Sequence, residues 1–237
     1  MASPVEQFQV QPLVGGESAV AFTNSSLWMV ISAVAVTVFL MASMRGRALV
    51  PTRMQSLAEI FYDVIANMIR DNVGSGGRKY FPFIFTLFMF ILFCNVFGMI
   101  PGGFTVTSHI VVTFALAAFI FIAVTIIGFA THGLHYLRMF FPHGAPLWTA
   151  VILIPVEIVS YLSRPISLSV RLFANMTVGH VLLKVIAGFV PALGIAGIVP
   201  FVFLVPLSAL ELFIAVLQAY IFTILSCVYL NDALHMH

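Results

Sequence analysis

Charged side chains lie inside an apolar stretch of this sequence, where each needs a physical reason. Glu157, Arg164, Arg171 and Lys184 all fall within residues 145–190. An Arg or Lys at the centre of a membrane span costs about 2.5–3.5 kcal/mol on insertion scales, and such residues usually belong to an ion path, a counter-ion pair or a ligand site. The alternative is that they end shorter helices and extend their charged groups to the membrane interface.

One helix face collects several polar residues of this stretch. Glu157, Arg164 and Arg171 are seven residues apart, and residues at that spacing share a face. Asn175 follows Arg171 by four residues, and three serines lie close to the same face, Ser160, Ser163 and Ser167. His180 is nine residues beyond Arg171, about half a turn round the helix, so it faces a different neighbour.

The last two apolar segments are predicted to form an antiparallel helix hairpin. Two Pro and two Gly fall within residues 191–200, which indicates a turn. Facing residues of such a hairpin have a nearly constant sum of residue numbers. His180 with Glu211 sums to 391 and Arg171 with Gln218 to 389, so each pair is expected at one depth. Titratable groups on both sides of Arg171 are the pattern expected of proton-relay groups around a fixed charge.

The composition excludes a soluble protein. Of 237 residues, 62% are hydrophobic and 8% are charged, whereas soluble domains carry about 25% charged residues. The two cysteines, Cys94 and Cys227, lie in apolar runs, which excludes a disulfide framework and a Cys-rich metal site. The net charge of +2 and the lack of a basic cluster give no sign of nucleic-acid binding. We therefore expect an integral protein of the lipid bilayer, without a cofactor or a metal.

The gaps between charged residues predict the spans, because a bilayer core needs about 20 helical residues. We expect an all-α membrane protein with about five membrane helices plus one amphipathic surface helix, in a single membrane domain over residues 1–237. The first span is placed at residues 26–44, a two-span hairpin at 81–131, and a long tilted helix hairpin carrying the ion path at 145–237. Residues 51–73 repeat apolar side chains every three or four positions, which predicts a helix on the membrane surface or against a soluble partner.

The apolar stretch before the turn is predicted to be one continuous helix. About 45 residues at 1.5 Å per residue give roughly 65 Å, so this helix must tilt strongly in a bilayer. A loop at Arg164–Arg171 would instead place two Arg on the side of the membrane that is otherwise free of Lys and Arg. Seven of the ten Lys and Arg lie between the first and second spans or just after the third.

Loops rich in Lys and Arg stay in the cytoplasm, so the tail of residues 1–25 is expected outside and the C-terminus inside the cell. The first 24 residues are polar without a positively charged n-region, so no cleavable signal peptide is predicted. The Arg bias and the lack of an import sequence favour a bacterial inner membrane. The mitochondrial inner membrane is the alternative.

Three segments resemble those of subunit a of F-type ATP synthases. The segment 164–180 reads Arg-Pro-Ile-Ser-Leu-Ser-Val-Arg-Leu-Phe-Ala-Asn-Met-Thr-Val-Gly-His and is similar to that family's signature. Residues 211–220 resemble its last helix, and residues 95–101 resemble the end of its second span. The match covers essentially the whole chain, and His180 with Glu211 resembles the alphaproteobacterial and mitochondrial type.

The resemblance implies a stator that forms two proton half-channels against a rotating ring of c subunits, each bringing one carboxylate. Arg171 would hold that carboxylate ionised and block leakage, because an Arg stays charged when it is desolvated. His180 and Glu211 would line the entry half-channel. Gln218 and Asn175 would orient Arg171 or water, and Glu157 would serve the exit side. It also implies peripheral-stalk subunits of the b type, a soluble ATPase head, and no catalytic site in this chain.

Other classes fit the pattern less well. A self-contained secondary transporter also uses broken helices and charges at mid-membrane, but predicts an inverted repeat that we do not find. A haem-binding subunit needs facing histidines at equal depth, and His132, His135 and His180 do not supply such a pair. An intramembrane hydrolase needs a nucleophile with a partner base, and Ser208 and Ser226 have none. Whether protons or sodium ions move, and the size of the ring, stay open.

Overall fold

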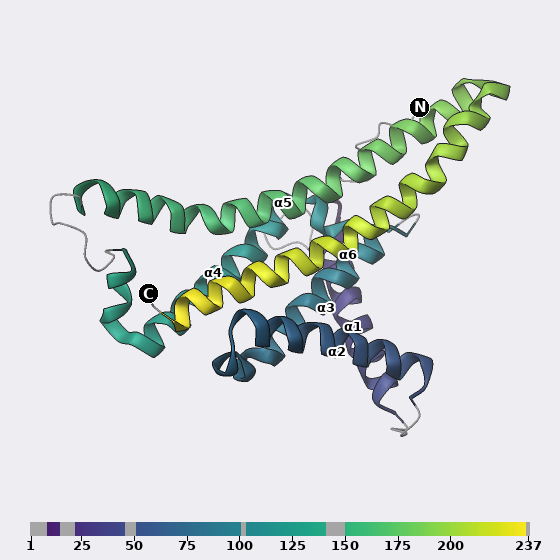
Figure 1. The fold of residues 1–237 in the computed structure, drawn as a ribbon. Coiled ribbons are helices and arrows are strands. Elements are labelled where there is room, and N and C mark those ends of the chain that lie inside the picture. The colour runs from purple at the N-terminus through teal and green to yellow at the C-terminus, as the bar shows by residue number, and fades with distance from the viewer. Residues whose placement is uncertain (1–8, 15–21, 46–50, 101–102, 141–149, 236–237) are drawn as a thin grey trace.

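The computed structural model describes residues 9–14, 22–45, 51–100, 103–140 and 150–235 (Figure 1). The helices are α1 (Asn24–Met44), α2 (Arg53–Asn72), α3 (Phe81–Gly98), α4 (Ile110–His132), α5 (Ala150–Ala192) and α6 (Ile198–Leu234). Short 3-10 segments are η2 (Ser75–Tyr80), η3 (Val106–Ser108), η4 (Gly133–Phe140) and η6 (Gly194–Gly197). By length and composition, five helical segments in the described part could cross a membrane, all except α2. The predicted all-α membrane fold is confirmed.

Some positions singled out above lie outside the described residues. They are residues 1–8 and 15–21 of the N-terminal tail, residue 101, and residues 145–149 and 236–237 of the last predicted segment. Near the N-terminus, β1 (Pro12–Val14) pairs antiparallel with β2 (Phe22–Thr23), which the sequence analysis did not anticipate. Strands of three and two residues are too short to carry a period of two. The Asn24 side chain supports the pairing, because its amide donates to Gln9 O at 3.0 Å and its oxygen accepts from Gln11 N at 3.2 Å.

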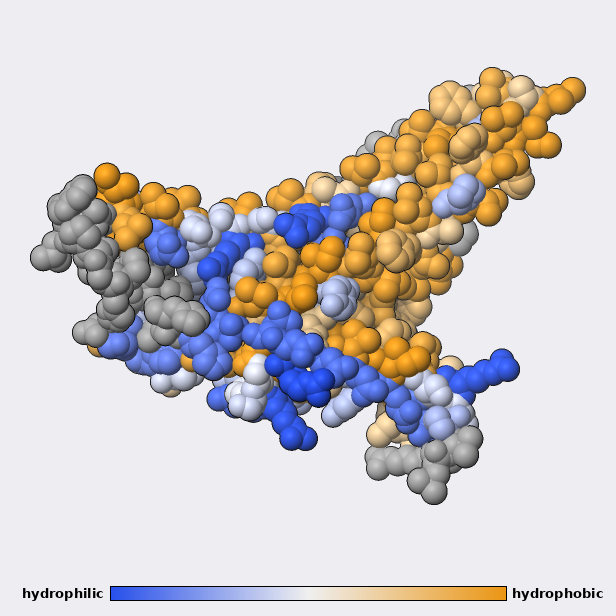
Figure 2. Space-filling model, viewed as in Figure 1, coloured by the Kyte–Doolittle hydropathy of each residue, from blue (hydrophilic) through white to orange (hydrophobic). Residues whose placement is uncertain are grey.

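Helices α5 and α6 form the long hairpin that the sequence predicts. Helix α5 is continuous over 43 residues, so the alternative of a loop at Arg164–Arg171 is wrong. Helix α6 has 37 residues, and in Figure 1 the two helices come together towards the turn that joins them. The end of the hairpin extends beyond the other helices, and Figure 2 shows it as almost entirely hydrophobic. An apolar surface of that kind suits lipid or another membrane protein.

Glycines make the tight turn between α5 and α6. Gly194 has φ of +57°, a region that side chains with a Cβ rarely adopt. A Cβ at Gly197 would overlap the carbonyl oxygen of Val190. The turn therefore depends on these residues and brings α6 back along α5.

Helix α2 is amphipathic and packs only partly on its own chain. Its N-terminus is capped by Thr52, whose hydroxyl accepts from Gln55 N at 3.4 Å. Ile65, Met68 and Ile69, towards its C-terminus, are buried. In the N-terminal half, the apolar residues Met54, Leu57 and Ile60 are exposed. This half has an apolar surface for a membrane or another protein.

The core lies where α3 meets α6. Ala215 and Ala219 of α6 are fully buried, and small residues let two membrane helices approach closely. Asn95 of α3 donates through Nδ2 to the Ala215 carbonyl at 3.0 Å. Helix α3 is thereby fixed against the part of α6 that carries the polar residues, and its last residue, Gly98, reaches the candidate site.

Candidate functional site

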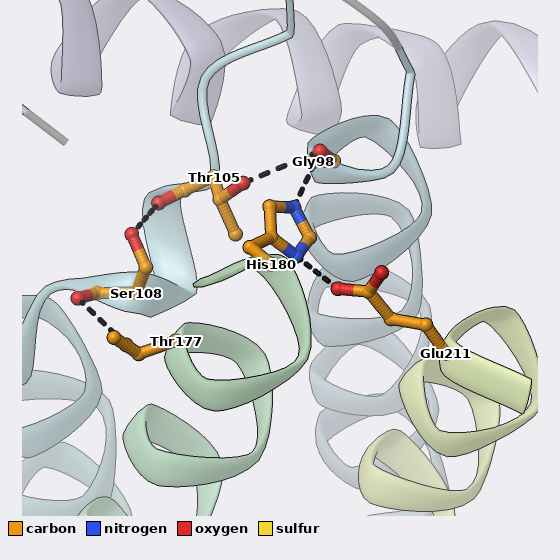
Figure 3. Close-up of polar contacts among 6 residues, drawn as sticks. All are labelled: Gly98, Thr105, Ser108, Thr177, His180 and Glu211. Carbon is orange, nitrogen blue, oxygen red and sulfur yellow. Dashed lines mark hydrogen bonds and ion pairs between the residues drawn. The ribbon is translucent and has the colours of Figure 1, made fainter. Parts of the chain in front are cut away.

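The centre of the candidate site is a pair between His180 of α5 and Glu211 of α6 (Figure 3). Nδ1 of the imidazole contacts Oε1 of the carboxylate in a hydrogen-bonded ion pair. His180 Nε2 lies 2.8 Å from the carbonyl oxygen of Gly98, the last residue of α3. Only 8% of His180 and 4% of Glu211 is exposed. The adjacent helices α5 and α6, together with the distant helix α3, therefore enclose one titratable pair.

The chain between α3 and α4 supports this pair. Thr105 donates its hydroxyl to the same Gly98 carbonyl at 3.2 Å, and Ser108 donates to the Thr105 carbonyl at 2.6 Å. Thr177 of α5 in turn donates to the Ser108 carbonyl at 3.3 Å (Figure 3). The Gly98 carbonyl is thus held by Thr105 as well as by His180, and the connection that carries Thr105 is tied to α5 through Ser108 and Thr177.

Gly179 provides the room that Glu211 occupies. A Cβ placed on Gly179 would lie 2.8 Å from Oε1 and 3.1 Å from Cδ of Glu211. Any side chain at this position would push the carboxylate away from the imidazole. The Gly-His sequence at 179–180 therefore has a steric role as well as a chemical one.

A second polar pair joins the same two helices. Asn175 Nδ2 donates to Gln218 Oε1 at 2.6 Å, and Gln218 is only 1% exposed. The sum of residue numbers predicts Gln218 at the depth of Arg171. Its hydrogen bond instead goes to Asn175, one turn along α5. Gln218 Nε2 is buried without a hydrogen-bond partner in the described residues, so a donor remains available beside the pair.

Arg171 and Glu157 stand apart from both pairs. The side chain of Arg171 is exposed, and within the described residues it makes no hydrogen bond or ion pair. Glu157 is half-buried on α5, and Arg164, seven residues further along the same face, forms its ion pair with Asp232. Of the predicted site residues, the structure therefore joins His180 with Glu211 and Asn175 with Gln218, and leaves Arg171 free to meet another molecule.

Sequence reasoning missed an ion pair near the other end of the hairpin. Arg164 Nη1 lies 2.9 Å from Asp232 Oδ2, and its guanidinium lies 5.5 Å and 5.2 Å from the ring centroids of Tyr161 and Tyr229. The Tyr161 hydroxyl is 2.7 Å from Thr125 Oγ1, so the cluster also reaches α4. The sum of residue numbers could have found the pair, since 164 and 232 sum to 396, close to 391 for His180 and Glu211.

The arrangement is suited to moving protons rather than to bond chemistry. It places a carboxylate and an imidazole in contact, away from bulk water, and two groups that both gain and lose protons can act as a relay. Within the described residues, no group of three or more His, Cys, Asp and Glu could hold a metal ion. An exposed arginine lies on the same helix, two to three turns from the buried pair.

Comparisons with known proteins agree with one another. A family model described as ATP synthase A chain matches residues 26–231. A protein named ATP synthase subunit a, from Paramagnetospirillum magneticum, is 64% identical over 247 aligned residues, covering 100% of both chains. Proteins of the same name from Rhodospirillum rubrum and Parvibaculum lavamentivorans are 61% and 55% identical. The match to the Rhodospirillum protein covers 100% of both chains, and the match to the Parvibaculum protein covers 98% of this chain and 93% of the relative.

Proposed function

This chain belongs to the ATP synthase A chain family, and we propose that it is the membrane stator subunit that carries protons past a rotating ring of c subunits. The observation that carries the proposal is the exposed Arg171 on α5, two to three helical turns from the buried pair of His180 and Glu211 in the same hairpin. The membrane potential supplies about 2.3 kcal/mol per proton per 100 mV, which is the work that drives the ring.

A polar stripe along α5 supports a protein partner at Arg171. Ser163, Ser167, Arg171 and Asn175 follow one another at intervals of four residues, and all four are exposed. An ionisable residue such as Arg171 within a membrane span almost always faces a protein interior or a water-filled cavity rather than lipid. A partner with one carboxylate at mid-membrane, as each c subunit brings, would give the guanidinium its counter-ion. Gln218 and Asn175 would keep Arg171 and nearby water oriented.

The positions of the titratable residues along α5 support two separate half-channels. His180 lies about 14 Å from Arg171 along the helix axis, and Glu157 lies about 21 Å away in the opposite direction, at 1.5 Å per residue. His180 and Glu211 would exchange protons with the outer side and Glu157 with the cytoplasmic side. Arg171 between them would stop a proton from crossing without the ring, since its charge persists when desolvated.

The remaining assignments follow from membership of the complex. The catalytic chemistry on ATP would lie in a soluble head, and peripheral-stalk subunits of the b type would hold this chain still against the ring. The positive residues between α1 and α3 support a cytoplasmic position for that connection, with the N-terminus outside and the C-terminus inside a bacterial inner membrane.

A self-contained secondary transporter is not supported. Relatives that match the chain over its full length are named ATP synthase subunit a. The exposed polar stripe of α5 also calls for another protein, which a self-contained transporter does not need.

The test is to extract the chain from its membrane in a mild detergent through a tag and identify by mass what remains bound. We expect a small hairpin proteolipid with a mid-helix carboxylate, together with a soluble ATPase head. Recovery of the chain alone and monodisperse would contradict the proposal, because Arg171 would then have to serve a substrate or an internal counter-ion.

A further inference from the structure

We propose that His180 gives and takes protons only through Nδ1, and that Glu211 alone carries the proton through the entry path. This inference rests on the proposed function, because it assigns separate tasks to two residues of the same half-channel. His180 is then a positioning residue for the Glu211 carboxylate, and the Gly98 carbonyl is the group that limits it to that task.

The contact between His180 and Gly98 fixes which ring nitrogen holds a hydrogen. A backbone carbonyl can only accept a hydrogen bond, so the nitrogen that faces it at 2.8 Å must donate. A neutral imidazole has one N–H group, and here that group is at Nε2. Nδ1 is therefore the acceptor in the neutral ring, and it is the nitrogen that faces Glu211.

The surroundings hold the ring in this orientation. The Gly98 carbonyl also accepts from the Thr105 hydroxyl, and Thr177 ties the same connection to α5. A Cβ on Gly98 would lie 2.9 Å from the Thr105 methyl carbon, so the peptide is packed closely against this side chain. Since His180 is only 8% exposed, turning its ring would break both hydrogen bonds inside a packed site.

The fixed orientation of the His180 ring limits the path that a proton can take. An imidazole that relays a proton through itself must accept at one nitrogen and release from the other. The Nε2 hydrogen of His180 points at the Gly98 carbonyl, which accepts a hydrogen bond but does not take up the proton itself. Release of a proton from Nε2 is therefore closed. His180 can therefore only take a proton from the Glu211 side and return it there. Lys184, one turn along α5, also acts electrostatically on the ring.

The Glu211 carboxylate has the free position that a carrier needs. Oε1 faces His180, whereas Oε2 is buried without a hydrogen-bond partner in the described residues. A proton that reaches Oε2 converts the carboxylate to a neutral acid, and its departure restores the carboxylate, with no other bond made or broken. His180 holds Oε1 in place and balances the negative charge between these events.

Nitrogen NMR on the whole complex, with histidine labelled in the imidazole nitrogens, tests the inference directly. The His180 signals are identified by their loss in His180→Gln. We expect Nε2 to carry a hydrogen at every pH from acid to alkaline, and any titration to appear at Nδ1 alone. A spectrum in which Nε2 has lost its hydrogen while Nδ1 keeps one would overturn the inference, even if the chain is an active stator.

Proton flux in vesicles separates the two tasks. A Gln at 180 can place an amide nitrogen where Nε2 lies and still donate to Gly98, so His180→Gln is expected to keep flux within about tenfold of the parent. Glu211→Gln removes the carrier and should lower flux by at least about 100-fold, the lower range for general acid–base groups. His180→Leu, which cannot donate, should fall below His180→Gln.

His132 provides a matched control, because its Nε2 contacts the Leu234 carbonyl at 3.1 Å far from Glu211. His132→Leu should leave flux close to the parent value. Equal loss of flux in His180→Gln and Glu211→Gln, in complexes assembled with their ring, would contradict the division of tasks. Absence of coupled flux in the parent complex would instead count against the proposed function itself.

Discussion

His180 and Glu211 are 31 positions apart in the sequence, yet their side chains form a buried ion pair across the facing surfaces of α5 and α6. Both residues are more than nine-tenths buried. Removing one partner of such a pair leaves a polar or charged group without compensation, which costs about 3–5 kcal/mol for buried ion pairs. The losses of stability on mutating the two positions are therefore expected to be coupled rather than additive, whereas their effects on proton flux differ.

Exchanging the two residues should be tolerated better than deleting either. In His180→Glu with Glu211→His, the ion pair can form again in the opposite sense between the same two helices. Proton flux should exceed that of His180→Ala and of Glu211→Ala. It should stay below the parent value, because a carboxylate at 180 cannot donate to the Gly98 carbonyl. ATP-driven proton pumping in inverted vesicles measures all four proteins, and a double exchange no better than the weaker single variant would contradict the prediction.

Gly179→Ala should reduce proton flux through sterics alone. The added Cβ would lie 2.8 Å from Glu211 Oε1, so the carboxylate must move away from His180. We expect a loss of about tenfold or more, in line with the factors of 10²–10⁴ that positioned proton-transfer groups contribute. The measurement is ATP-driven pumping by complexes shown to contain the chain in normal amount.

Gly188→Ala is the matched control for that variant. Gly188 lies on the same helix, and a Cβ there would meet nothing within 4 Å. Its effect on flux should be small, and an Ala at a helix interior is favoured over Gly by up to about 1 kcal/mol. Equal losses in the two variants would show that Gly179 matters for the helix rather than for Glu211.

The hairpin and its central pair were predictable because both follow from periodicity and length. Long runs without charge predict α5 and α6, and the constant sum of residue numbers places His180 opposite Glu211. The sum rises from 391 at that pair to 393 for Asn175 and Gln218 and to 396 for Arg164 and Asp232. The register therefore drifts along the hairpin, and a strictly constant sum of 391 would set Gln218 opposite residue 173, midway between Arg171 and Asn175.

The supporting groups were not predictable by the same means. Gly98 acts through its backbone carbonyl, and an amide carbonyl has no signature in the sequence. Its place depends on how α3 ends and on the bonds of Thr105 and Thr177, which span separate parts of the chain. Asp232 is different, because the sum of residue numbers does place it near Arg164.

Arg164 and Asp232 are expected to stabilise the hairpin as a pair. Their side chains are 25% and 37% exposed, so the ion pair alone is partly screened, but each contact of the guanidinium with Tyr161 or Tyr229 adds about 0.5–2 kcal/mol. Arg164→Gln should lower the thermal denaturation midpoint of the purified complex. The charge exchange Arg164→Asp with Asp232→Arg should recover only part of that loss, since the tyrosine contacts are not restored.

Lys184→Gln is the comparison for Arg164→Gln. It removes a positive charge from the same helix but leaves the contacts of Arg164 with Asp232 and the tyrosines unchanged. A midpoint lowered equally by both variants would show that charge on α5, and not the contact with Asp232, determines stability. If a variant changed at both Arg164 and Asp232 lowers the midpoint by the sum of what the two single changes cost, Arg164 and Asp232 act independently.

Arg171→Ala should abolish ATP-driven pumping and open a passive proton leak. The exposed guanidinium is the fixed charge between His180 on one side and Glu157 on the other, and without it a proton meets no positive barrier on the stripe. Arg171→Lys tests whether charge alone suffices, since an ammonium group can lose its proton when desolvated and should couple poorly. Pumping and passive conductance are measured in the same vesicles, with Arg53→Ala on the exposed end of α2 as the control. Normal pumping in Arg171→Ala would remove the basis of the stator assignment, whereas lost pumping with a raised leak is the result that only a charge placed between two half-channels explains.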